Sequence, residues 1–154
     1  MEEEIINLIE DKKFNNLKEY LQNVNSTDLS IIFEEFDDEK IIIVYRLLSK
    51  EKAAEVFAEL DSDIQEKLIN SFSDKELKNV INELFMDDTV DLIEEMPSNV
   101  VKRILKNIDN QDRKTINELL NYPEDSAGSI MTTEFIHLKE DMTVEQSLEK
   151  IKKI

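Results

Sequence analysis

The chain has 154 residues, with 19 lysines and arginines against 36 aspartates and glutamates, and a net charge of −17. This charge argues against nucleic acid or anionic lipid as a direct partner, because both bind cationic surfaces, and the absence of cysteine excludes disulfides and thiolate metal sites. With one glycine and two prolines, the chain has too few turn residues for long sheets, and it holds no apolar run long enough to span a bilayer.

The first predicted element is a short helix over residues 3–10, which we expect to cap one end of the fold. An apolar pattern with a period of twelve residues follows it. Each unit closes on an apolar residue, and most units carry further large apolar residues three, four and seven positions earlier. This spacing places the apolar side chains on one face of an α-helix. The closing residues are Val24, Phe36, Leu48, Leu60, Phe72, Leu84, Met96, Ile108 and Leu120.

Residues that commonly cap helix N-termini stand eleven positions before most of these closing residues. They are Asn25, Asp37, Ser49, Asp61, Ser73 and Asp109. Ser73 and Glu76 also have the spacing of a capping box.

A helix of about nine residues is not stable alone, so each unit must bury its apolar face against its neighbours. We therefore predict an all-α fold, a right-handed superhelix (an α-solenoid) of about ten short helices in twelve-residue units, built from stacked helix pairs. A compact irregular bundle is the alternative. The persistence of the period through nine units favours the superhelix.

The unit over residues 85–96 departs most from the pattern, because it has Phe85 at the capping position and contains five acidic residues and no basic one. We expect Asp88, or else Asp87, to replace the missing N-cap. Asp87 and Asp91 are four residues apart, so their carboxylates share one helix face, about 6 Å apart. These acids either cap a helix and face solvent, or offer oxygen ligands to a divalent ion such as Mg²⁺.

Glu55 occupies the same position in its unit as Asp91, three units earlier. The sequence contains no Gly-rich phosphate loop and no nucleophile–base set, so we do not predict an enzyme. His137 is the only histidine, and a histidine metal set is therefore excluded.

The repeat ends after Leu120, where residues 123–130 form a predicted linker that holds Pro123 and the only glycine. Residues 131–138 read as an extended segment, and Thr143 is the expected N-cap of a helix over residues 143–151. One strand and one helix cannot bury a core. We therefore predict three parts: a helical-repeat domain over residues 1–122, the linker, and the incomplete start of a second domain over residues 131–154.

Three motifs in order resemble the MgtE-type magnesium transporter family and cover nearly the whole chain: residues 52–56, residues 84–92 and residues 122–131. Residues 131–145 also resemble the entrance of a CBS domain. The twelve-residue helices are similar to repeats of the flagellar switch protein FliG, which leaves open an alternative role as a scaffold for a basic protein partner.

The resemblance to the transporter family implies a cytosolic magnesium-sensing domain on the cytoplasmic face of the cell membrane. In that family Mg²⁺ binds between the N domain, the CBS domains and a connecting helix, and this closes the pore. Asp87, Asp91 and Glu55 match the acidic sensing positions, so we expect them to face the metal. The partners implied are the CBS domains and connecting helix of the same transporter, in a homodimer. We expect Mg²⁺ binding by this chain alone to be weak or absent, because the other ligands are missing from it.

Overall fold

The computed structural model describes residues 1–123, 126–129, 131–133 and 135–152, in which the regular elements are all helices. The all-α prediction is confirmed. The helices are α1 (Glu2–Glu10), α2 (Phe14–Asn23), α3 (Ser26–Glu34), α4 (Asp38–Leu47), α5 (Lys50–Ala58), α6 (Ser62–Ser71), α7 (Asp74–Glu83), α8 (Met86–Glu95), α9 (Ser98–Asn107), α10 (Asn110–Leu119) and α11 (Val144–Ile151).

The predicted capping residues begin the helices as expected. Asn25, Asp37, Ser49 and Asp109 each accept a hydrogen bond from a backbone N–H of the following first turn. Ser73 and Glu76 form the predicted capping box of α7. Asp61 occupies the capping position of α6 without such a side-chain hydrogen bond. Local sequence therefore sets the start of most helices in the repeat.

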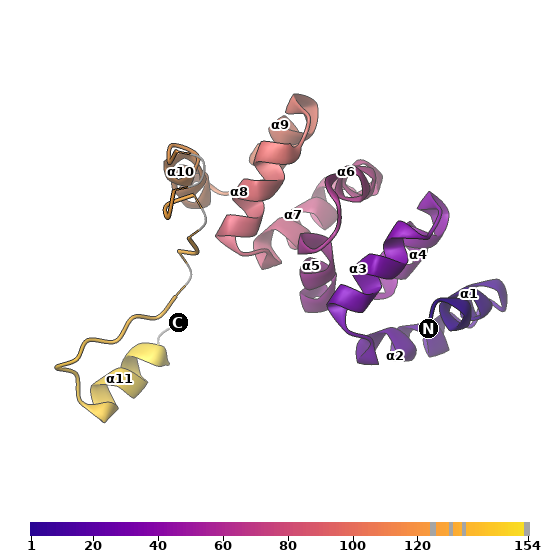
Figure 1. Cartoon of the computed structure of the whole chain (residues 1–154), viewed down its shortest axis with the longest axis horizontal. Coiled ribbons are helices and arrows are strands. Elements are labelled where there is room, and N and C mark those ends of the chain that lie inside the picture. The colour runs from indigo at the N-terminus through magenta and orange to yellow at the C-terminus, as the bar shows by residue number, and fades with distance from the viewer. Residues whose placement is uncertain (124–125, 130, 134, 153–154) are drawn as a thin grey trace.

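Most helices stack with the helix two places further along the chain, while α1 packs on α2. One row contains α2, α4 and α6, a second contains α3, α5, α7 and α9, and α8 packs on α10. The result is an elongated stack that runs from α1 to α10 (Figure 1). This pairing of alternate helices is what stacked pairs of twelve-residue units predict.

The core is one continuous strip of aliphatic and aromatic side chains along the stack. Seven of the nine closing residues are buried, while Leu48 and Leu120 are partly buried. Phe33 and Phe57 are fully buried. Burying a side chain of this size contributes about 2 kcal/mol, which the short helices cannot obtain alone.

The C-terminal part differs from the prediction in one element. The described residues of 131–138 contain no strand, because no second extended segment in the described part offers a hydrogen-bond ladder to them. The helix is present as α11, with Thr143 as its N-cap. It stands apart from the stack (Figure 1), and none of its residues is buried.

The only glycine, Gly128, lies against the ring of Tyr122. A Cβ atom at this position would lie 2.3 Å from Cδ1 of Tyr122. Any larger residue would therefore have to displace the tyrosine ring, at the point where the chain leaves the stack.

Candidate functional site

The predicted site residues come from α5 and α8, near the middle of the stack. Asp91, on α8, is exposed and lines a hollow of about 480 Å³. Its other acidic lining residues are Asp61, Asp63, Asp88 and Glu95, and no basic side chain lines it. The hollow therefore gathers carboxylates from α8 and from the start of α6.

Asp87, one helical turn before Asp91, is half-buried. Its Oδ1 is buried and has no hydrogen-bond partner among the described residues. A buried carboxylate oxygen in this state lacks the donors that normally stabilise it, so it is a candidate ligand for a cation. Asp87 is not among the residues that line the Asp91 hollow.

The expected substitution of the α8 cap by Asp88 or Asp87 is wrong. The helix begins at Met86, with Phe85 at the N-cap position and no side-chain cap hydrogen bond. Burial of Leu84, Leu92 and Met96 keeps the twelve-residue register and fixes where the helix starts. Asp87 and Asp88 lie inside its first turn, where the helix dipole favours negative charge.

Glu55, on α5, lines a second hollow, of about 410 Å³. Its Oε2 accepts a hydrogen bond from Ser26 Oγ at 2.7 Å, and Thr27 Oγ1 donates to the neighbouring Glu59 at 3.2 Å. The two hollows adjoin, because Ala58 and Asp88 line both of them. The structure thus places Glu55 and Asp91 in adjoining hollows rather than in one.

The rim of the second hollow is anionic. The carboxylate of Glu51 accepts a hydrogen bond from the backbone N–H of Glu51 and another from the Ser49 hydroxyl, and both lower its pKa. Glu51 is exposed and therefore remains ionised at neutral pH. Carboxylate oxygens are the ligands that hard divalent ions prefer, so the residues present are of the chemical type that binds Mg²⁺.

Within the described part of the chain, no group of three or more carboxylate or histidine side chains is arranged to hold a metal ion. Nor is any helix there long and apolar enough to cross a membrane.

Sequence reasoning missed four acidic members of the Asp91 hollow, one of which is Glu95, a neighbour of Asp91 on the same helix. Asp61 reads as a helix cap, Asp88 as a substitute cap, and Asp63 has no periodic signal. Their common location follows from the packing of the stack, which the apolar period implies only in outline. The run of acids in α8 without a base is the one local signal that marks this place.

Comparison with known proteins gives consistent results. The family profile described as the MgtE intracellular N domain matches residues 24–125. The magnesium transporter MgtE of Bacillus subtilis (strain 168) is 25% identical over 148 residues, which cover 96% of this chain and 33% of the relative. The magnesium transporter MgtE of Thermus thermophilus is 30% identical over 136 residues, covering 86% and 30% respectively. The chain thus spans about a third of the length of these relatives.

Two solved structures share the fold. The cytosolic domain of the Mg²⁺ channel MgtE in complex with ATP superposes with a TM-score of 0.87 at 27% identity, over 99% of this chain and 63% of that one. The soluble part of a magnesium transporter gives a TM-score of 0.82 at 21% identity, over 99% and 62%.

Proposed function

This chain belongs to the MgtE intracellular N domain family, and from this premise we propose that it is a magnesium-sensing regulatory domain of an MgtE-type transporter. The proposal assigns it no catalytic step. It places the chain on the cytoplasmic side of the membrane, with residues 1–122 as the N domain, residues 123–130 as a linker and residues 131–154 as the start of a CBS domain. The unburied apolar face of α11, with Val144, Leu148 and Ile151 exposed, supports an incomplete second domain.

The observation that carries the proposal is the hollow around Asp91, which is lined by five carboxylates and no base. Asp87, Asp91 and Glu55 would be the residues that face the metal. The buried Oδ1 of Asp87 supports this assignment, because it has no donor in the described part of the chain. Mg²⁺ retains several waters and needs only one or two carboxylates from each surface, so this chain need not supply a complete set.

The mechanism follows from electrostatics. Carboxylates on the N domain repel those of another acidic surface brought against them, and a shared cation would neutralise both. We propose that the other surface consists of the CBS domains and the connecting helix of the same transporter, acting as a homodimer. Asp87, Asp91 and Glu55 then favour the closed, pore-shutting arrangement only when magnesium is plentiful. The effect is limited by the difference in magnesium affinity between the two arrangements.

The test compares the complete cytosolic region with a variant carrying Asp87→Asn and Asp91→Asn. Mg²⁺ is titrated, and the radius of gyration is followed by small-angle X-ray scattering. We expect the wild type to compact as Mg²⁺ is added. The variant should need a roughly tenfold higher Mg²⁺ concentration, because coupling between two sites typically changes an affinity by about 5- to 150-fold.

A control variant with Glu2→Gln and Glu3→Gln loses the same charge at α1, far from the hollow, and should behave as the wild type. If the Asp87 and Asp91 variant compacts at the wild-type concentration, these two residues are not the ligands.

A further inference from the structure

Phe85 is the residue at the start of α8 that the fold does not explain. The equivalent positions of the other units carry residues of the capping type, apart from Lys13 and Pro97. Phe85 makes no capping hydrogen bond, and 61% of its surface is exposed. It therefore neither satisfies the first turn of α8 nor contributes to the core. A departure from the local rule without a packing gain indicates a role outside the fold.

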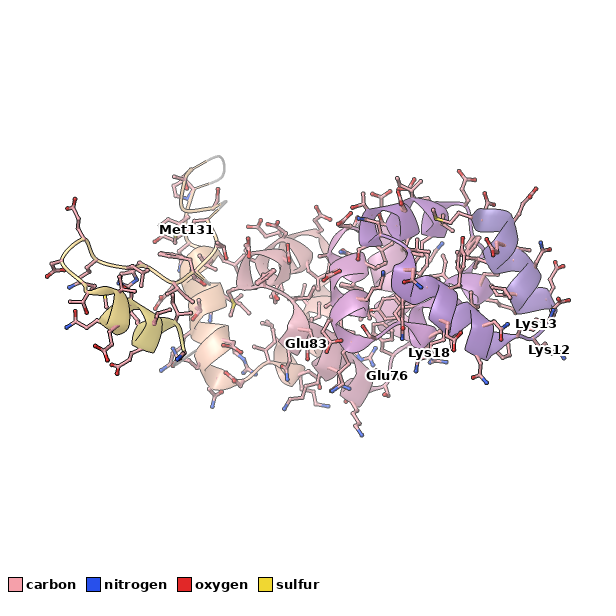
Figure 2. The ribbon with its side chains drawn as sticks, turned by 90° about the horizontal axis from the view of Figure 1, so that it is seen from below. Lys12, Lys13, Lys18, Glu76, Glu83 and Met131 are labelled. Atoms are coloured by element: carbon pink, nitrogen blue, oxygen red, sulfur yellow. The ribbon has the colours of Figure 1, made fainter. Side chains whose placement is uncertain are left out.

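The ring of Phe85 belongs to the 410 Å³ hollow between α5 and the α7–α8 connection. Ala54 and Leu84 give this hollow a buried apolar floor. The acidic lining residues are Glu51, Glu55, Glu59, Glu83 and Asp88, and no basic residue lines the hollow. Glu83 is seen near the middle of the stack in Figure 2, whereas Lys12 and Lys13 lie at its N-terminal end.

An exposed aromatic ring beside several carboxylates suits one kind of ligand. The aliphatic stem of an arginine or lysine can lie on the ring and the apolar floor, while its charged head meets the carboxylates. A hydrated magnesium ion makes no use of a phenyl ring, because it binds oxygen ligands. We propose that this hollow docks an arginine- or lysine-bearing segment of a protein partner, a role that goes beyond magnesium sensing.

Binding of a fluorescein-labelled peptide of alternating leucine and arginine to the 154-residue chain tests this proposal, by fluorescence polarisation at an ionic strength of about 0.15 M. Phe85→Ser should weaken binding roughly tenfold or more, because buried anchor residues dominate such contacts. Phe14→Ser removes an equally large ring that is 41% exposed at the start of α2, and should leave the affinity unchanged. Circular dichroism confirms that each variant is folded.

A charge-matched pair separates docking from general attraction to an acidic protein. One variant carries Glu51→Gln, Glu59→Gln and Glu83→Gln, and the other changes the three glutamates at residues 2–4 to glutamine. We expect only the first to weaken binding. Equal loss in both variants, or unchanged affinity of Phe85→Ser, would overturn the proposal.

Two further outcomes are informative. The variant with Asp87→Asn and Asp91→Asn should keep its peptide affinity, so that failure of the magnesium proposal and failure of this one are distinguishable. If the peptide does not bind, and the wild type self-associates on sedimentation while Phe85→Ser does not, a second copy of the chain occupies the hollow and the proposal is wrong.

Discussion

At the scale of single residues, the start of α8 lacks the side-chain capping hydrogen bond that most other helices of the repeat make. In α3, α4 and α7 a polar side chain accepts a hydrogen bond from the first turn, whereas at α8 the corresponding side chain is the phenyl group of Phe85. The phenyl group is also held in contact with water, which is unfavourable. The residue thus reduces stability at the place where we assign it a binding role.

We predict that Phe85→Ser raises the free energy of unfolding by about 1 kcal/mol, because serine at an N-cap satisfies a free backbone N–H. Urea denaturation followed by circular dichroism measures this change. Phe14→Ser, which creates no cap at α2, should change the free energy by no more than about 0.5 kcal/mol. If Phe85→Ser is instead destabilised, the ring contributes to packing and needs no partner to explain it.

At the scale of elements, long basic side chains complete several helix C-termini. Lys52 donates to the carbonyls of Gln22 and Val24 at the end of α2. Arg113 donates to the carbonyls of Leu105 and Ile108 at the end of α9. Helices often end in a glycine with a left-handed conformation, but the only glycine of this chain lies beyond α10. In this chain, cationic side chains from other helices donate to the free carbonyls at these helix ends. Their positive charge also interacts favourably with the negative end of the helix dipole.

Arg103 allows the clearest test of whether basic side chains stabilise helix C-termini in this way. It donates to the carbonyls of Ile69 and Phe72 at the end of α6 and pairs with Asp74, whose pKa it lowers. Arg103→Met should reduce the free energy of unfolding by about 2 kcal/mol, since part-buried carbonyls lose a charged donor. Denaturant titration measures the change.

The control is Lys106→Met on the same helix. Lys106 is 75% exposed and pairs with the same Asp74 at 3.5 Å. An exposed ion pair of this kind contributes at most about 1 kcal/mol. Similar losses in the two variants would mean that Asp74 pairing, rather than completion of α6, explains the effect of Arg103.

The stack was predictable from the sequence because the residues that define it repeat with a fixed period. Leu68, Val80 and Ile104 are buried where the period places them, and Ser73 caps the helix it was expected to cap. The start of α8 was not predictable from its acids, since buried apolar residues set the register more strongly than a cap does. The prediction of a strand over residues 131–138 was wrong for the described residues, because a strand requires a partner strand that the described part of the chain does not provide.

The predicted site was only partly accessible to sequence reasoning. Asp87 and Asp91 follow from helical spacing and from the family resemblance. That Asp61 and Asp63 line the hollow of Asp91 depends on how α6 and α8 sit in the stack. Similarly, the hydrogen bond from the Ser26 hydroxyl to Glu55 joins α3 to α5, and no local sequence pattern specifies that these two helices are in contact. The role of Asp87, Asp91 and Glu55 in binding magnesium stays a prediction.

At the scale of the whole molecule, most of the net charge of −17 is carried by the elongated stack of short helices α1 to α10. The carboxylates therefore lie close to one another along its surface, and their mutual repulsion opposes the folded state. Ion pairs such as that of Lys67 with Asp38, at 3.0 Å, offset only part of this repulsion.

We accordingly predict that the melting temperature rises by a few degrees when NaCl is increased from about 0.05 M to 0.5 M, because salt screens repulsion between exposed charges. Thermal unfolding followed by circular dichroism measures the shift. A variant with Glu51→Gln, Glu59→Gln and Glu83→Gln should show a smaller shift, because it carries less charge. A melting temperature that is independent of salt in the wild type would show that the existing ion pairs already balance the charge.

The stacking of alternate helices has a consequence for biosynthesis. Most helices pack on the helix two places further along, so most of the stack forms from segments that are close in the sequence. The chain can then fold in order as it leaves the ribosome, each new helix sealing the apolar face of one already placed. On this view α5 has its partner α3 already in place when it emerges, so the contact between Glu55 and Ser26 can form before α8 has been synthesised.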